Sequence, residues 1–176
     1  GNQVDGDKKV NRAGALIHAA ILGARPDINY SAHTHSRAGA AVSAMKCGLL
    51  PLSQHAGLIM PTVCIHPYQD VTTAEDECEA LAKDIGENFA MIMENHGLLA
   101  CGRSIGECFY YLYYLETACK IQVDVLASGQ EPLLLSEKIV DGLFTDGDVP
   151  KNEPSGADDW KPQLRWVDRN MPGYRD

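Results

Sequence analysis

Hydrophobic and polar positions follow two periods along the first 130 residues of the chain. Apolar side chains recur at helical spacing in several stretches, which are preceded by residues that can cap a helix, such as Asn11, Ser36 and Ser104. These stretches predict helices over residues 12–24, 37–47, 74–85 and 104–128. Short apolar runs between them predict strands over residues 28–32, 62–66, 89–93 and 98–101.

The pattern weakens after residue 129. Residues 136–144 can form a short helix, and residues 160–166 a last amphipathic segment. The stretch between them, 145–159, is rich in Gly, Pro, Asp and Ser, which predicts a mobile loop. We therefore expect a domain over residues 1–144 and a loop and tail over residues 145–176. Residues 3–10 resemble a hairpin turn with no strand before it, so we expect the domain to be incomplete at its N-terminus.

Three histidines stand where predicted strands end. His33 and His35 follow the strand 28–32 and share one face if it continues, because side chains two residues apart on a strand point the same way. His96 falls just past the strand 89–93. Three imidazoles leave a coordination position free on a divalent transition metal, and all-nitrogen ligation favours zinc. The simpler interpretation is that the first two are partly buried histidines bonded to the backbone.

Composition narrows the class of partner. Lys and Arg number 15 against 24 Asp and Glu, a net charge of −9, which disfavours nucleic acid or an anionic membrane as the main partner. No apolar run is long enough to predict a membrane span, and no signal peptide is recognisable. The six cysteines are scattered without a CxxC motif, which favours free thiols in a reducing, cytoplasmic setting.

Several motifs, in this order, resemble the class II aldolase/adducin family. They are His33-Thr34-His35, Gly48-Leu49-Leu50-Pro51, Asn95-His96-Gly97-Leu98-Leu99 and the run from Phe109 through Val123. The resemblance covers roughly residues 3–130, and His96 follows His35 at a separation of 61 positions. Zinc-dependent sugar-phosphate aldolases form the family's best-known branch, and the adducin head domain forms a non-enzymatic one.

The resemblance implies a three-layer α/β/α sandwich around a mainly antiparallel sheet, assembled as a homotetramer. It implies that His33, His35 and His96 hold the metal, and that Tyr68 donates a proton in a neighbouring subunit's site. The implied reaction is that of a lyase: a C–C bond in a small hydroxylated carbonyl compound breaks or forms through a metal-stabilised enediolate. An epimerase or dehydratase on the same site would differ only in the fate of the enediolate.

The chain departs from the aldolase pattern at the acid/base. Where the aldolases carry a glutamate that both ligates the metal and moves a proton, the matching residue is Gly14. The elements that grip the substrate phosphate have no counterpart in this chain. Substitutes for the missing group are Glu94, His66, His55 and Asp70, and Glu94 could also orient His96. A non-catalytic, adducin-like scaffold with a vestigial or structural metal site is the alternative function.

Overall fold

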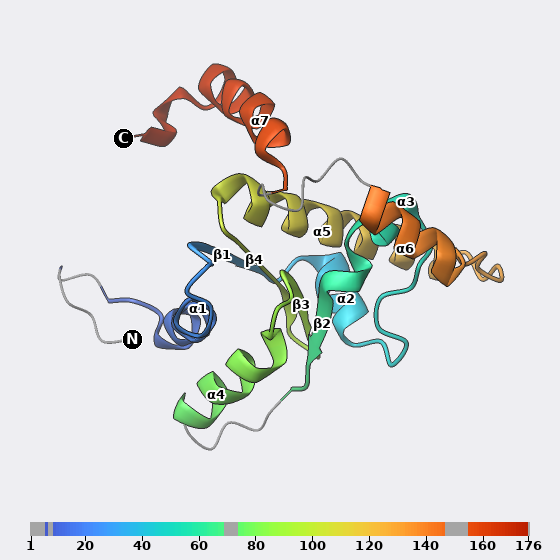
Figure 1. Ribbon diagram of the computed structural model, residues 1–176, viewed down its shortest axis with the longest axis horizontal. Coiled ribbons are helices and arrows are strands. Elements are labelled where there is room, and N and C mark those ends of the chain that lie inside the picture. The colour runs from blue at the N-terminus through green and yellow to red at the C-terminus, as the bar shows by residue number, and fades with distance from the viewer. Residues whose placement is uncertain (1–5, 7–8, 69–73, 147–154, 176) are drawn as a thin grey trace.

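The computed structural model describes residues 6, 9–68, 74–146 and 155–175, and its centre is a four-stranded sheet (Figure 1). The strands are β1 (Tyr30–Thr34), β2 (Val63–His66), β3 (Ala90–Met93) and β4 (Gly97–Gly102). Their order across the sheet is β1-β4-β3-β2. β4 is antiparallel to both of its neighbours, and β2 is parallel to β3. The expectation of a mainly antiparallel sheet is confirmed.

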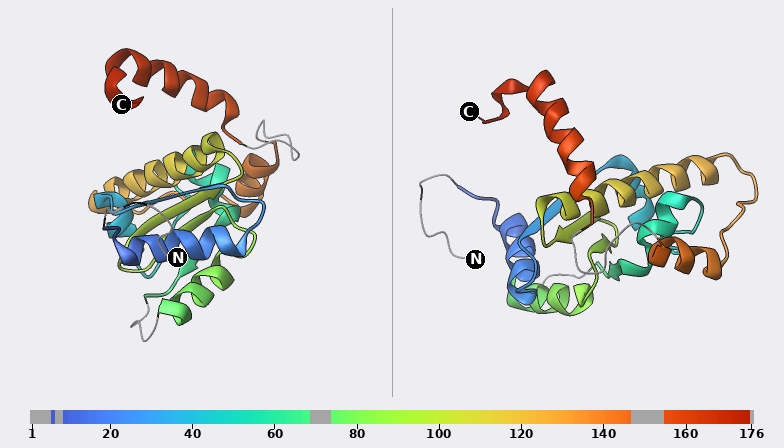
Figure 2. Two further views of the ribbon diagram at one scale, coloured as in Figure 1. Left: turned by 90° about the vertical axis from the view of Figure 1, so that its left-hand side faces the viewer. Right: turned by 45° about the horizontal axis from the view of Figure 1, so that its top comes forward.

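Helices cover both faces of this sheet, as Figure 2 shows from two sides. One layer holds α1 (Arg12–Ala24) and α4 (Ala74–Ile85), and the other holds α2 (Arg37–Ser43), α3 (Gln54–Ile59) and the long α5 (Ile105–Ala127). A 3₁₀ turn (Met60–Thr62) follows α3, and α6 (Glu137–Asp146) packs against it from outside. The three-layer α/β/α sandwich is confirmed.

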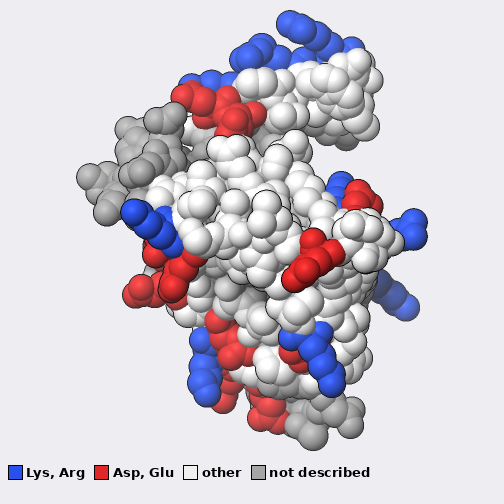
Figure 3. Space-filling model, turned by 90° about the vertical axis from the view of Figure 1, so that its right-hand side faces the viewer, with Lys and Arg blue, Asp and Glu red and all other residues white. Residues whose placement is uncertain are grey.

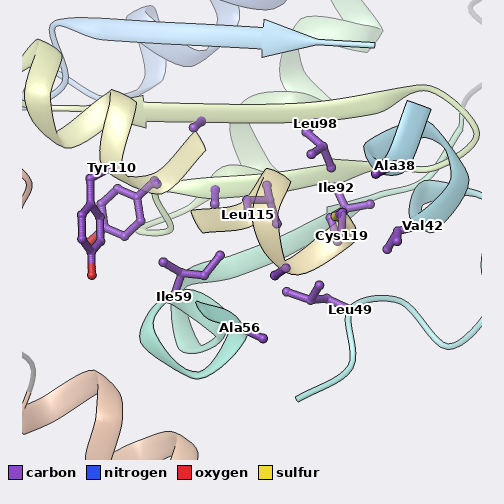
Figure 4. Packing of buried hydrophobic residues seen from close by; sticks show 14 residues of the cluster. Ala38, Val42, Leu49, Ala56, Ile59, Ile92, Leu98, Tyr110, Leu115 and Cys119 are labelled. Atoms are coloured by element: carbon purple, nitrogen blue, oxygen red, sulfur yellow. The ribbon is translucent and has the colours of Figure 1, made fainter. Parts of the chain in front are cut away.

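The central strands are apolar along their whole length because both of their faces are buried. Met91 and Met93 of β3 pack with α1 and α4, whereas Ile92, between them, packs with α2 and α5. Figure 4 shows the hydrophobic cluster that contains Ile92, in which Leu115 and Cys119 of α5 lie over the sheet. This rigid centre fixes the strand ends, and therefore the residues that follow them.

Most predicted elements are present, with corrections at their ends. Side chains of Asn11, Ser36 and Ser104 cap α1, α2 and α5 as expected. β1 begins two residues later than expected, so it contains His33. The second helix ends at Ser43 rather than at residue 47, because the next amides bond to carbonyls three residues back and tighten the turn. The short helix α3 was not anticipated.

A buried carboxylate joins the sheet to the C-terminal segment. Glu107, at the start of α5, is fully buried. Its side chain accepts hydrogen bonds from the Arg103 backbone at 2.7 Å, the Arg103 guanidinium at 2.6 Å and the Ser155 backbone at 3.2 Å. Because one charged group satisfies donors from two distant stretches, it fixes where the chain returns to α5.

From that point α7 (Ala157–Asn170) stands away from the body in all three ribbon views (Figures 1 and 2). Gly106 and Gly156 touch so closely that a Cβ on Gly156 would lie 2.6 Å from the Gly106 carbonyl oxygen. Trp160 packs on Phe109, with ring centroids 5.4 Å apart. A 3₁₀ turn (Pro172–Arg175) follows. The amphipathic segment expected at 160–166 is therefore the middle of a longer helix.

The remaining expectations about this part of the chain are not tested. Residues 147–154, within the predicted loop 145–159, lie outside the described residues, as does part of the predicted hairpin turn 3–10. The domain boundary after residue 144 stays a prediction.

In Figure 3, Lys and Arg gather along the projecting segment at the top, above a broad uncharged surface. Among the described residues, no helix combines the length and apolar character needed to cross a membrane.

Candidate metal centre

The sheet brings the three predicted histidines together. β1 carries His33, His35 follows its last residue, and His96 lies in the turn between β3 and β4. Because β1 pairs with β4, the two segments meet although 61 positions separate His35 from His96. One possible ligand atom from each histidine lies within 4.8 Å of the other two. The ring centroids form a nearly equal triangle with sides of 4.6, 4.8 and 4.5 Å.

Two residues beside His96 shape the turn that carries it. Asn95 has φ of 54°, the left-handed conformation that asparagine tolerates better than most residues, and its amide donates to the Ser43 carbonyl at 3.0 Å. Gly97 lies against β1: a Cβ there would overlap the Thr34 carbonyl oxygen and lie 3.3 Å from the His35 ring. The turn therefore needs an αL residue before His96 and a glycine after it.

We expect Asn95→Ala to weaken metal binding about tenfold and to lower the free energy of unfolding by about 1 kcal/mol, because alanine disfavours positive φ. Asn95→Gly, which adopts this conformation freely, should retain both properties. Zinc titration with a competing chelator and urea denaturation measure the two effects. Equal zinc affinity in both variants would show that the αL conformation does not position His96.

The hydrogen bonds of His33 set its protonation pattern. Nδ1 lies 2.8 Å from the Leu98 carbonyl oxygen, which can only accept, so Nδ1 carries the proton and Nε2 presents a lone pair. That Nε2 lies 2.7 Å from Nε2 of His35, which donates to it in this arrangement. A backbone carbonyl that holds the far nitrogen of a histidine is the usual support of a metal-ligating imidazole.

Burial favours the neutral ring at two of the three histidines. It lowers the pKa of His33, and the neighbouring His96 and His35 lower it further, against the hydrogen bond to Leu98. Burial and then His35 lower the pKa of His96, although Glu77 acts in the opposite direction. Because a metal binds the unprotonated imidazole, the lowered pKa of His33 and His96 and the convergence of three ring nitrogens fit a divalent transition-metal ion.

A small cavity of about 110 Å³ opens beside His96. Its walls include both residues that the sequence offered as catalytic, Tyr68 and Glu94. Tyr68 is 66% exposed and follows the end of β2, whereas Glu94 begins the turn after β3. The structure thus brings Tyr68, Glu94 and His96 to one cavity, and leaves most of the Tyr68 side chain exposed.

The same cavity contains a histidine–aspartate pair. His66, the last residue of β2, is 4% exposed, and its Nδ1 lies 2.7 Å from Oδ2 of Asp84 on α4. Glu77, also on α4, completes the wall. Sequence reasoning named His66 among the substitutes but missed Glu77 and Asp84. Their spacing of seven residues, which puts both on one face of a helix, was the available signal.

Position 14 borders open space near the cluster. His18 of α1 lies 2.7 Å from Ser31 of β1, and Gly14 is one turn earlier on the same helix face. Because β1 runs back along α1 after the turn 25–29, position 14 falls alongside His33. A Cβ on Gly14 would meet nothing within 4 Å. Among the described residues, there is therefore room for a side chain at position 14.

His55, another suggested substitute, lies away from the centre. It is on α3, across the sheet, with its ring 5.7 Å from that of Tyr114. Asp70 lies outside the described residues. Of the three suggestions that the structure describes, Glu94 and His66 share a cavity with His96.

The fold and the cluster define a three-layer α/β/α domain with three histidines where neighbouring strands end. The chain belongs to the family described as the Class II Aldolase and Adducin N-terminal domain, whose model matches residues 1–123. A Caulobacter vibrioides protein, whose name assigns it to class 2 of the aldolases, is 36% identical over 167 residues, or 95% of this chain and 65% of that protein. Alpha-adducin of Rattus norvegicus is 47% identical over 124 residues, 70% of this chain and 17% of the adducin.

Solved structures agree with this assignment. An aldolase II superfamily protein from Pseudomonas syringae superposes on this chain with a TM-score of 0.86 at 37% sequence identity. The match covers 95% of this chain and 67% of the Pseudomonas protein. L-fuculose 1-phosphate aldolase from Glaciozyma antarctica PI12 has a TM-score of 0.78 at 25% identity, covering 94% of this chain and 64% of its own. The chain thus spans about two thirds of these proteins.

Proposed function

We propose that this protein is a metal-dependent lyase that makes or breaks a C–C bond in a small hydroxylated carbonyl compound. The observation that carries the proposal is the convergence of His33, His35 and His96 beside a cavity lined by Tyr68 and Glu94. Family membership supports it, because an L-fuculose 1-phosphate aldolase shares the fold. We further propose zinc as the metal, a homotetrameric assembly and a cytoplasmic location.

The three histidines would hold the ion through ring nitrogens, with His33 oriented by the Leu98 carbonyl. A bound divalent cation supplies Lewis acidity, which stabilises the negative charge left on the ketone fragment when the C–C bond breaks. The chain's own groups handle the protons: a base takes the proton from the hydroxyl at the cleaved carbon, and an acid protonates the new carbanion. Tyr68 is suited to donate, and Glu94 to accept.

A non-catalytic scaffold is the second candidate. Gly14 favours it, because no side chain at this position can move a proton. The identity of 47% with alpha-adducin points the same way. In a scaffold the histidine cluster would bind metal without turnover.

Retro-aldol assays distinguish the two candidates. Zinc-loaded protein is incubated with hydroxy-ketone phosphates and with the unphosphorylated ketoses, and aldehyde release is followed by coupled reduction. We expect zinc-dependent turnover that falls at least a hundredfold in Tyr68→Phe, which loses the proton donor but keeps the ring. Tyr113→Phe, a half-exposed tyrosine on α5, serves as the matched control. Zinc binding without turnover on any substrate would favour the scaffold.

A further inference from the structure

The cavity beside His96 has a built polar wall that the metal centre itself does not use. His66 is almost fully buried, yet it lines the cavity. Its Nδ1 is held by Asp84 at 2.7 Å, whereas Nε2 has no hydrogen-bond partner among the described residues. The bond to Asp84 uses one ring nitrogen and leaves the other, Nε2, available for a second hydrogen bond. His66 can therefore hydrogen-bond to a hydroxyl group, which both donates and accepts.

The charges around this acceptor have one sign. Glu77 and Glu94 line the same cavity, and Asp84 stands behind His66. None of the described residues that line it is a Lys or Arg. Glu77 acts on His96 as a negative charge that raises its pKa, which agrees with its nearness to the centre. Among the described lining residues a phosphate group would meet only like charge, whereas hydroxyl groups would find carboxylate acceptors.

We infer that this cavity is a subsite for the hydroxyl groups of a neutral polyol chain, and that it excludes a phosphorylated end. The inference rests on the proposed function, in which the carbonyl end of the same substrate lies at the three histidines. Nε2 of His66 forms a hydrogen bond with one hydroxyl, and Glu77 accepts a hydrogen bond from another. The substrate class is thus a short keto-sugar whose end on this side of the centre is unphosphorylated.

Binding can be measured locally with two probes that differ by one phosphate. Uniformly ¹⁵N-labelled protein, metal-free and zinc-loaded, is titrated with L-erythrulose and with erythrulose 4-phosphate. Dissociation constants are read from the backbone amides of His66 and Glu94. We expect erythrulose to bind at least tenfold more tightly than its phosphate at these amides. If erythrulose 4-phosphate binds there as tightly as erythrulose, the inference is overturned.

Variants separate recognition from mere packing. Glu77→Gln removes one negative charge at constant size. It should therefore lower the ratio of the dissociation constants of erythrulose 4-phosphate and erythrulose at least threefold. Glu79→Gln, an exposed residue of the same helix α4, should leave the preference unchanged. His66→Leu should weaken erythrulose binding about tenfold with zinc content unchanged, and His66→Gln, which retains an acceptor, should restore most of it. A preference unaltered in Glu77→Gln would contradict the subsite even if His66→Leu fails to fold.

The outcomes for the subsite and for the lyase are distinct. Erythrulose shifts at His66 and Glu94 in a protein that binds no zinc would support the subsite and remove the lyase. Zinc bound by the three histidines, with retro-aldol turnover but no response of sugar binding to either Glu77→Gln or His66→Leu, would support the lyase and remove the subsite.

Discussion

Replacing His96 by alanine is expected to lower zinc affinity at least a hundredfold and to reduce bound zinc from about one ion per chain to less than a tenth. His96 comes from a different strand end than His33 and His35, so its loss leaves two ligands on one side of the ion. The two remaining imidazoles are too few protein ligands to hold the ion tightly. Elemental analysis after dialysis, and zinc titration against a chelator, measure the loss.

His55→Ala is the matched control for this experiment. His55 is a half-buried histidine like His96, but it lies on α3 across the sheet, beside Tyr114. Zinc should raise the melting temperature of the unaltered protein and of His55→Ala, because a ligand that binds only the folded state stabilises it. It should have no such effect on His96→Ala. Equal zinc content in the two variants would refute a metal centre at the three histidines.

Glu107→Ala is expected to cost about 3 kcal/mol of the free energy of unfolding. The variant leaves the Arg103 and Ser155 amides without their acceptor and opens a cavity at a fully buried position. Arg103 is 31% exposed, so water can solvate part of its freed charge. Urea denaturation gives the loss directly. Trypsin should also cleave α7 faster, because the Ser155 amide, just before this helix, is no longer held by Glu107.

Two further variants make this test specific. Glu107→Gln keeps the size but turns an NH₂ group toward donors, so its stability should lie between those of the alanine variant and the unaltered protein. Glu79→Ala removes an exposed glutamate on α4 and should change the free energy of unfolding by less than about 0.5 kcal/mol. If Glu107→Ala is no less stable than Glu79→Ala, the buried carboxylate does not stabilise the fold.

The sequence predicted most helices and strands of this fold well because their signals are local, whereas the layers followed from the family resemblance. Capping side chains and apolar periods do not depend on distant residues, so the first residue of α1 was predicted correctly and that of α5 to within one position. The pairing of β1 with β4 could be proposed only through the family resemblance, since no local pattern encodes which strands meet. The end of α2, where the chain tightens into a turn, and both ends of β1, which depend on pairing with the distant β4, were misplaced.

The candidate site divides in the same way. Histidines are rare enough to be noticed, so His33, His35 and His96 were predicted from spacing and resemblance. Glu77 and Asp84 are carboxylates on an acidic helix, and nothing in composition separates them from its solvated residues such as Glu79. The seven-residue spacing of Glu77 and Asp84 puts them on one helix face, but the partner of that face is fixed by the packing of α4 against β2, which brings Asp84 to His66.

The tight contact between Gly97 and Thr34 has a consequence beyond this chain. A side chain of any size after the third histidine would push the neighbouring strand outward, and the first histidine pair would move with it. The residue at this one position therefore offers a simple criterion for sorting adducin-like sequences: those with glycine there can retain an intact triad, whereas those with a larger residue must have rearranged the strand pair that supports it.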